Sequence, residues 1–269
     1  MQYLGGKSKI SKEIATLIDN ILTNLGGGYM RYLGGKSRIS TQLSNVVNTT
    51  FVERGERVFV SLFCGSCAIE SKVNADVKIL NDKHPYLIAM WKALQNGWIP
   101  PEEISKEQYK YIKEHKDEDM ALSGFVGFGC SFGGKWFGGL AANKRGQNYC
   151  RGANRSLLRD IIGLKNATFL CLDYKDVEIP QDAIVYADPP YDKTTGYSLG
   201  DFDSNEFWSY VRKLSETNIV LISEEKAPDD FVSIWHKEQK RMIDNVNKNI
   251  FTRTENLFIH KKYENMLNL

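Results

Sequence analysis

The chain has 269 residues, a net charge of +2, 42% hydrophobic and 25% charged residues, and a mean hydropathy of −0.38. These values exclude a fully disordered, fibrous or disulfide-scaffold protein and indicate a globular chain long enough to bury a core. No apolar run approaches the roughly 20 residues of a membrane span. The first residues, MQYLGGKSKI, lack the apolar stretch of a secretory signal.

The five cysteines predict reduced thiols in a cytoplasmic protein. Cys64 and Cys67 form a C-x-x-C pair, but no second pair lies at zinc spacing. The other three are scattered along the chain: Cys130, Cys150 and Cys171. We therefore expect no metal site.

The N-terminal part contains a repeat, because MQYLGGKSKIS (1–11) recurs as MRYLGGKSRIS (30–40). Each copy leads from a Gly-Gly-Lys turn into a stretch with helical period, over 10–22 and 39–47. Three glycines at 26–28 break the chain between the copies. Two copies are too few for a solenoid, so residues 1–29 are predicted to be a local duplication.

From Val58 onward, short apolar runs alternate with stretches of helical period. Strands are predicted at 58–63, 77–80, 167–172, 183–187 and 218–223, helices at 68–73, 86–94 and 205–214, and a late hairpin at 237–243 and 256–263. This order favours an α/β fold with a doubly wound, mostly parallel sheet and a late antiparallel element.

Residues 123–152 interleave glycine, aromatic and basic residues without either period, which predicts a large ordered loop or a small inserted module rather than core. Basic residues exceed acidic ones between Gly133 and Lys165, where Asp160 is the single acid. Such a local excess indicates an anionic partner, with a solvated loop as the alternative.

The most specific motif is Asp188-Pro189-Pro190-Tyr191, directly after the apolar run AIVYA. An acid at the carboxyl end of a strand faces the crevice where open α/β sheets bind ligands. The two prolines stiffen the turn and leave carbonyls free to accept hydrogen bonds. Two acceptors beside an aromatic ring suit an exocyclic amine on a flat ring; a simple proline-rich turn is the alternative.

Taken in order, these motifs resemble those of the Dam-type (D12 class) S-adenosylmethionine-dependent DNA adenine-N6 methyltransferases, especially phage-borne members. The resemblance covers most of the chain: Tyr-x-Gly-Gly-Lys, a glycine turn after the first strand, an acid after the second, an insert, and Asp-Pro-Pro-Tyr. It implies a Rossmann-like methyltransferase fold, S-adenosylmethionine as cofactor and double-stranded DNA as substrate. It also implies a prokaryotic or phage-infected cytoplasm and no obligate protein partner. It leaves open a restriction nuclease in the same restriction–modification system.

The resemblance divides the chain into a duplicated segment (1–29), a catalytic domain (30–95 and 160–269) and an inserted target-recognition module (96–159). The cofactor-binding residues it implies are Tyr32, Gly34, Gly35, Lys36, Phe63, Cys64, Gly65, Ser66, Asp82, Asp173, Tyr174 and Asp188. The second copy of the repeat is preferred because the strand at Val58 follows it after one short helix. The chain departs from the family at Cys67, where a glycine is preferred, and at Ser61, where an acid is common.

In the mechanism that the resemblance implies, Asp82 accepts hydrogen bonds from the ribose, and Asp173 receives the adenine amine of the cofactor. Asp82 as a helix cap and Asp173 as a strand-end turn are the alternatives. The catalytic residues are Asp188, Pro189, Pro190 and Tyr191. The target base is flipped out of the duplex, Tyr191 stacks on it, and Asp188 and Pro189 accept its amine hydrogens. No covalent intermediate is needed, so both thiols of the C-x-x-C pair are expected to be buried and inert.

The segment around 123–152 supplies the DNA contacts that the resemblance implies. The phosphate-contact candidates are Lys135, Lys144, Arg145, Arg151 and Arg155, and the base-reading candidates are Asn143, Gln147 and Asn148. The aromatic residues Phe132, Trp136 and Phe137 are candidates for the same surface or for the module's own core.

Other functions compete with adenine-N6 methylation. The same chemistry suits cytosine N4, RNA or a protein amide, although Asp188 rather than an asparagine favours adenine in DNA. A DNA-binding protein without catalysis is a second alternative, supported only by the departures from the family at Cys67 and Ser61. A dinucleotide-dependent oxidoreductase is disfavoured, because no G-x-G-x-x-G follows the first strand.

Overall fold

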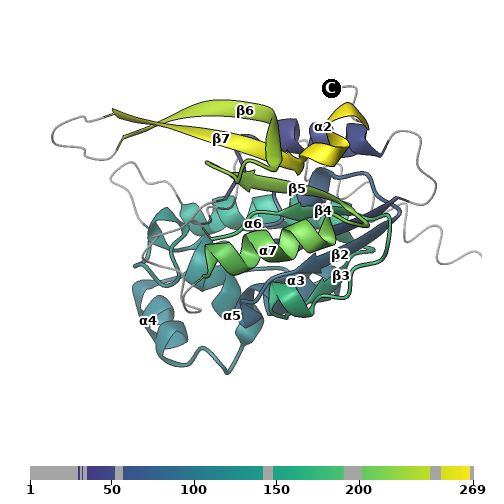
Figure 1. Ribbon diagram of the computed structural model, residues 1–269. Helices are drawn as coiled ribbons and strands as arrows, with labels where there is room; N and C mark the ends of the chain where they lie inside the picture. Colours follow the sequence, from purple (N-terminus) through teal and green to yellow (C-terminus); the bar gives the residue numbers. More distant parts are fainter. Residues whose placement is uncertain are drawn as a thin grey trace, which may run out of the picture.

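The centre of the molecule is a single sheet (Figure 1). The computed structural model describes residues 30, 32, 35–51, 57–141, 148–190, 202–242 and 250–266. Over these residues the sheet has seven strands in the order β3-β2-β1-β4-β5-β7-β6. The strands are β1 (Val58–Ser61), β2 (Val77–Asn81), β3 (Thr168–Leu170), β4 (Ile184–Ala187), β5 (Ile219–Glu224), β6 (Phe231–Met242) and β7 (Ile250–His260).

Strands β1 to β5 run parallel, and β7 pairs antiparallel with both β5 and β6. The strand order reverses between β1 and β4, and such a switch point opens a crevice at the carboxyl ends of the strands. The predicted fold class, a doubly wound and mostly parallel sheet with a late antiparallel hairpin, is confirmed.

The described helices are α2 (Ser40–Thr50), α3 (Pro85–Gln95), α4 (Lys106–Glu114), α5 (Met120–Gly124), α6 (Tyr149–Asp160) and α7 (Ser204–Leu214). The helices predicted at 39–47, 86–94 and 205–214 are confirmed. The helix predicted at 68–73 is wrong, because only the short 3₁₀ turn η1 (Glu70–Lys72) forms there. The helix predicted at 10–22 lies outside the described residues. Among the described residues, no helix is long and apolar enough to cross a membrane.

Side chains of the central strands alternate between the two faces of the sheet. Phe59, Ile184 and Tyr186 pack into one hydrophobic cluster with α2, α3, α5 and α6. Val60 and Val185 point into the other cluster, which α7 covers (Figure 1). Since both faces of a parallel sheet are buried, its strands are continuously apolar, and this made them predictable.

The described part of residues 123–152 differs from the prediction of a large ordered loop or small inserted module outside the core. It contains the end of α5, a π-helical turn η2 (Phe125–Gly129) and the start of α6, and both Phe125 and Phe128 are buried in the core. Glycine permits this packing, because a Cβ on Gly124 would lie 2.2 Å from the Tyr86 carbonyl oxygen. Glycines therefore occupy closely packed positions where apolar side chains would have shown a helical period.

The late hairpin is longer than predicted. Its strands β6 and β7 extend past the edge of the parallel strands in Figure 1. Near its base, β7 pairs with β5 through Ser223 and Leu257. This pairing brings Glu255 close to the carboxyl ends of the central strands.

Candidate active site

A pocket of about 330 Å³ lies at the carboxyl ends of the central strands. Its walls come from Tyr32, Gly35 and Lys36, the turn after β1, the residues after β2 and β3, and the turn after β4. It therefore occupies the crevice at the switch point of the sheet, where α/β proteins bind ligands.

The second copy of the repeat contributes to this pocket through Tyr32, Gly35 and Lys36. The Gly35 N–H donates to the Tyr32 carbonyl oxygen at 2.9 Å, and a Cβ on Gly35 would lie 3.0 Å from that oxygen. The tight turn thus favours glycine, because a Cβ would force a neighbouring group to shift. The fourth predicted residue, Gly34, lies outside the described residues, as does the whole first copy.

Lys36 is buried between two carboxylates. Its Nζ lies 2.9 Å from Glu255 Oε1 and 3.2 Å from Asp188 Oδ1. The Ser223 hydroxyl donates to the same Glu255 oxygen at 2.9 Å. Glu255 was not predicted, since it is a single acid in the stretch TENLFI, 219 residues from its partner. The network fixes the cation beside the acid of the Asp-Pro-Pro turn.

The turn after β1 brings Phe63, Cys64, Gly65 and Ser66 to the pocket. Gly65 has φ +47°, and a Cβ there would lie 3.0 Å from the ring of Tyr32. Cys67 has φ +49°, so this cysteine adopts the left-handed conformation in which the resembled family prefers glycine.

Neither thiol of this turn is activated. Both Cys64 and Cys67 are buried, and burial raises the pKa of Cys64 to about 11 and that of Cys67 well above its usual value. A nucleophilic cysteine requires a lowered pKa, so the thiols have no such role.

Asp82 follows β2 and is buried at the pocket wall. Its Oδ2 accepts the Gly65 N–H and its Oδ1 accepts the His84 N–H, both at 2.9 Å. The helix-cap alternative is wrong, because the N-cap of α3 is His84 and no side chain caps this helix. The carboxylate instead fixes the backbone just ahead of α3 and also lines the pocket. Each oxygen keeps a second lone pair for a ligand hydroxyl.

His84 contributes an aromatic ring to the pocket wall and a ring nitrogen without a hydrogen-bond partner among the described residues. Its ring packs against Phe128 and Trp136 at centroid distances of 4.8 and 4.5 Å, and all three line the pocket. Burial lowers the pKa of His84 to about 4, so the imidazole is neutral. Its buried Nδ1 has no hydrogen-bond partner among the described residues.

Asp173 and Tyr174 line the opposite part of the pocket, after β3. Asp173 accepts from Lys83 Nζ at 3.0 Å, and its Oδ1 accepts the Lys175 N–H at 3.3 Å. It therefore also forms the strand-end turn given as its alternative. The Tyr174 ring packs on Phe63, with centroids 5.3 Å apart.

Glu70 is a further carboxylate of the pocket that the sequence did not single out. Its side chain lies against Ser61 at the end of β1, and burial raises its pKa to about 7. Of the Asp-Pro-Pro-Tyr turn, Asp188 and Pro190 line the pocket, Pro189 is buried beside them, and Tyr191 lies outside the described residues.

These residues fit a ligand that combines positive charge, hydroxyl groups and an aromatic base. Carboxylates line the pocket on several sides, aromatic rings form a wall, and His84 Nδ1 is an unsatisfied polar atom. S-adenosylmethionine has each of these features.

Of the predicted DNA-contact residues, the four that the structure describes do not line this pocket. Asn148 caps α6 by accepting the Arg151 N–H at 2.9 Å. Arg151 makes ion pairs with Glu102 and Glu103 at 2.9 and 2.8 Å. Lys135 and Arg155 are also described. The remaining candidates lie outside the described residues: Asn143, Lys144, Arg145 and Gln147.

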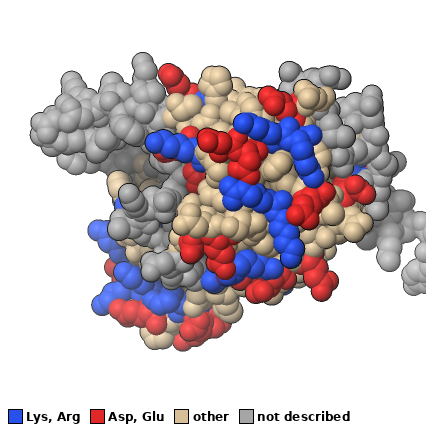
Figure 2. Space-filling view, in the orientation of Figure 1, with Lys and Arg blue, Asp and Glu red and all other residues tan. Residues whose placement is uncertain are grey.

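The aromatic candidates of this segment separate by burial. Phe132 is 67% exposed, whereas Phe137 is buried in the core, and Trp136 lines the pocket. Only Phe132 is therefore placed on the surface. The face in Figure 2 mixes Lys and Arg with Asp and Glu, so on this view no single charge sign dominates.

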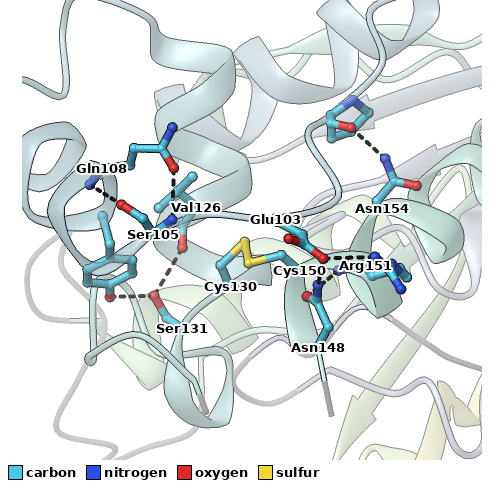
Figure 3. Close-up of a disulfide and its surroundings, with 12 residues drawn as sticks. Glu103, Ser105, Gln108, Val126, Cys130, Ser131, Asn148, Cys150, Arg151 and Asn154 are labelled. Carbon is cyan, nitrogen blue, oxygen red and sulfur yellow. Dashed lines mark hydrogen bonds and ion pairs between the residues drawn. A yellow bond between two sulfur atoms is a disulfide. The ribbon is translucent and has the colours of Figure 1, made fainter. Parts of the chain in front are cut away.

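Cys130 and Cys150 form a disulfide (Figure 3), so the prediction of reduced thiols is wrong for this pair. Their Cα atoms are 4.7 Å apart, where the end of η2 meets α6. A separation of 20 residues within an irregular stretch gave no spacing signal. Among the described residues Cys64, Cys67 and Cys171 are free.

Comparison with known proteins supports the predicted resemblance. Residues 32–125 match the family model of the D12 class N6 adenine-specific DNA methyltransferases. The match spans the Gly-Gly-Lys turn, the β1 turn and Asp82. It indicates a methyltransferase that uses S-adenosylmethionine.

Solved structures with similarity to the chain include the rRNA methyltransferase AviRa from Streptomyces viridochromogenes, with 13% identity, 85% of this chain and 86% of that chain covered, and a TM-score of 0.41. A putative RNA methyltransferase from Pyrococcus horikoshii has 12% identity, with 93% of this chain and 97% of that chain covered and a TM-score of 0.41. A putative class I S-adenosylmethionine-dependent methyltransferase from Listeria monocytogenes has 8% identity, with 94% of this chain and 68% of that chain covered and a TM-score of 0.40. Similarities of this size bear on neither activity nor substrate.

Proposed function

We propose that the protein transfers a methyl group from S-adenosylmethionine to the N6 amine of a flipped-out adenine in double-stranded DNA. The observation that carries this proposal is the position of Asp188. It stands at the carboxyl end of β4, lines the same pocket as Asp82 and is paired with Lys36 of the Gly-Gly-Lys turn. The D12 family match over residues 32–125 supports the choice of adenine in DNA as substrate.

In this proposal the two ends of the pocket hold different parts of the cofactor. Asp82 accepts hydrogen bonds from the ribose hydroxyls, and Asp173 accepts the amine of the cofactor's adenine. The Gly-Gly-Lys turn and the turn after β1 surround its amino-acid end. When bound, the cofactor supplies an electrophilic methyl group.

The chain's own residues then orient the target amine. The Asp188 carboxylate and the Pro189 carbonyl accept its two hydrogens, which directs the nitrogen lone pair out of the ring. Tyr191, on the same turn, stacks on the base. Lys36 holds the Asp188 carboxylate in place, since its Nζ is 3.2 Å away and is itself fixed by Glu255. Positioning of this kind supplies most of the rate in a direct displacement.

DNA recognition is assigned to residues 96–159, as an inserted module. Phosphate contacts are proposed for Lys135, Lys144, Arg145, Arg151 and Arg155. Base contacts are proposed for Asn143, Gln147 and Asn148. Arg151 would exchange its acidic partners Glu102 and Glu103 for phosphate on binding.

The test is methyl transfer from labelled S-adenosylmethionine to unmethylated duplex DNA, followed by nucleoside analysis. Asp188→Ala is compared with wild type and with Asp229→Ala, a change at an exposed acid outside the pocket. We expect N6-methyladenine from wild type and the control, and none from Asp188→Ala.

Other outcomes would contradict the proposal in distinct ways. Methylcytosine alone would move the target to N4 of cytosine. Cofactor binding without transfer to DNA would move it to RNA or a protein amide. A wild-type protein that binds DNA but no cofactor would be a DNA-binding relative without catalysis.

A further inference from the structure

Glu70 is a buried carboxylate that the proposed chemistry does not use. It is 2% exposed, begins the 3₁₀ turn η1 and lines the pocket. Its Oε1 accepts the Ser61 hydroxyl at 2.8 Å, and its Oε2 accepts the Ile69 N–H at 3.2 Å. These two donors fix the position of the carboxylate.

No Lys or Arg pairs with this carboxylate among the described residues. Lys78 comes near, but its Nζ donates to the backbone carbonyls of Glu70 and Gly163, at 3.1 and 2.7 Å. Lys36 is held by Glu255 and Asp188. Buried carboxylates are otherwise paired, because an uncompensated charge is costly in a low-dielectric interior. Glu70 thus presents an uncompensated carboxylate to the pocket.

The ligand group that meets such a carboxylate must carry positive charge and donate hydrogen bonds. S-adenosylmethionine has two cationic centres, its sulfonium and its α-ammonium, and only the ammonium has N–H donors. A ribose hydroxyl donates a hydrogen bond but leaves the negative charge uncompensated. The chemistry of Glu70 therefore selects the amino-acid end of the cofactor.

We propose that Glu70 binds the α-ammonium group of the cofactor, with Ser61 as the positioning residue that holds its carboxylate. This inference rests on the proposed function. It gives a structural meaning to Ser61, the position where the resembled family often has an acid. In this chain the carboxylate comes from nine residues further along and reaches the same strand end.

The experiment compares two adenine nucleosides by calorimetric titration at pH 8. S-adenosylhomocysteine carries the α-ammonium group, and 5′-methylthioadenosine lacks the whole amino-acid end. Glu70→Gln should weaken binding of the first by about ten- to hundredfold, the value of one charge-assisted hydrogen bond, and leave binding of the second unchanged. Glu216→Gln, an exposed acid outside the pocket, is the matched control and should change neither.

A pH profile adds a readout that a purely structural role would not move. Protonation of Glu70 competes with ammonium binding, so the wild-type affinity for S-adenosylhomocysteine should rise with pH up to about 7, where its pKa lies. Glu70→Gln should remove this dependence. Ser61→Ala should shift it to higher pH, because the Ser61 hydroxyl stabilises the ionised carboxylate. The other titratable groups that face Glu70 are Cys64, Cys67, Lys78, Tyr186 and Asp188.

Three results would overturn the inference. One is equal loss of both nucleosides in Glu70→Gln, another is unchanged binding of both. The third is a flat wild-type profile between pH 6 and 8, which needs no variant and holds even where Glu70→Gln fails to fold. A wild-type protein that binds neither nucleoside would instead refute the proposed function itself, and this inference with it.

Discussion

The pocket and the segment that faces DNA in our proposal use charge in opposite ways. In the pocket, the side chains of Lys36 and Glu255 are 4% and 2% exposed, and each is held by defined partners. In the segment, Arg151 and Glu103 pair while 42% and 71% exposed. Buried pairs are costly to break, whereas exposed pairs contribute little and exchange partners readily. The comparison contrasts a buried network with defined partners in the pocket and exposed ion pairs that can exchange partners in the segment.

The largest effect is expected from breaking the buried network. Lys36→Met leaves Glu255 and Asp188 without their cation and should lower the free energy of unfolding by about 3–5 kcal/mol. Denaturant unfolding measures it, with Lys135→Met as the exposed control. The double variant with Glu255→Gln should lose less than the sum of the two single losses. Equal stability of Lys36→Met and wild type would contradict the network.

Glu70 should make the free energy of unfolding of the protein depend on pH. Its carboxyl ionises near 4.5 in the unfolded chain, and burial raises its pKa to about 7 in the native state. Between these values the native state holds the extra proton, so stability falls as the pH rises and is constant above 7. The loss is on the order of 3 kcal/mol.

Glu70→Gln should therefore be more stable than wild type at pH 8 without ligand, and similar at pH 4. Thermal unfolding at both pH values measures this, with Glu216→Gln as the control. A variant that is less stable at pH 8 would show that the carboxylate is compensated within the protein.

The disulfide between Cys130 and Cys150 should contribute to the stability of the fold and not to the chemistry in the pocket. Closing a loop of 20 residues is worth about 3 kcal/mol in the chain-entropy model. Cys150→Ser, or reduction of wild type, should lower unfolding stability by up to that amount. Cys171→Ser, at an exposed free thiol, should change it by less than about 0.5 kcal/mol. Insensitivity of wild type to reductant would speak against the bond.

On the exposed side, single changes should have small effects on stability and visible effects on DNA affinity. Arg151→Ala should weaken binding similarly for all sequences and reduce the slope of log affinity against log salt by about 1. Glu103→Gln should strengthen binding, because it removes one of the two acidic partners of Arg151. Lys213→Ala, on α7, is the control. An unchanged salt slope would remove Arg151 from the interface.

The smallest effect is expected at the duplicated segment. The second copy supplies Tyr32, Gly35 and Lys36 to the pocket, so the first copy, residues 1–29, is predicted to be dispensable. Deleting it should leave cofactor affinity unchanged, as should Lys7→Ala. A large loss of affinity in a folded deletion variant would contradict this.

Much of the fold was predictable because its signals are local. The central strands are buried on both faces and read as continuous apolar runs, and α3 and α7 keep a helical period. The segment at 123–152 was misjudged for the opposite reason. There, Gly124 and Gly127 lie where a Cβ would clash with neighbouring groups, so close packing left no periodic side chains to detect.

The sequence by itself determined the strand–helix order, the glycine turns and the Asp-Pro-Pro turn, since each is set by residues adjacent in the chain. Only the tertiary structure decided which distant side chains share a buried environment. Lys36 meets Glu255 because β7 inserts beside β5, and Cys130 meets Cys150 because α6 packs on η2. Such pairings depend on strand order and burial, and neither is encoded in any short stretch of residues.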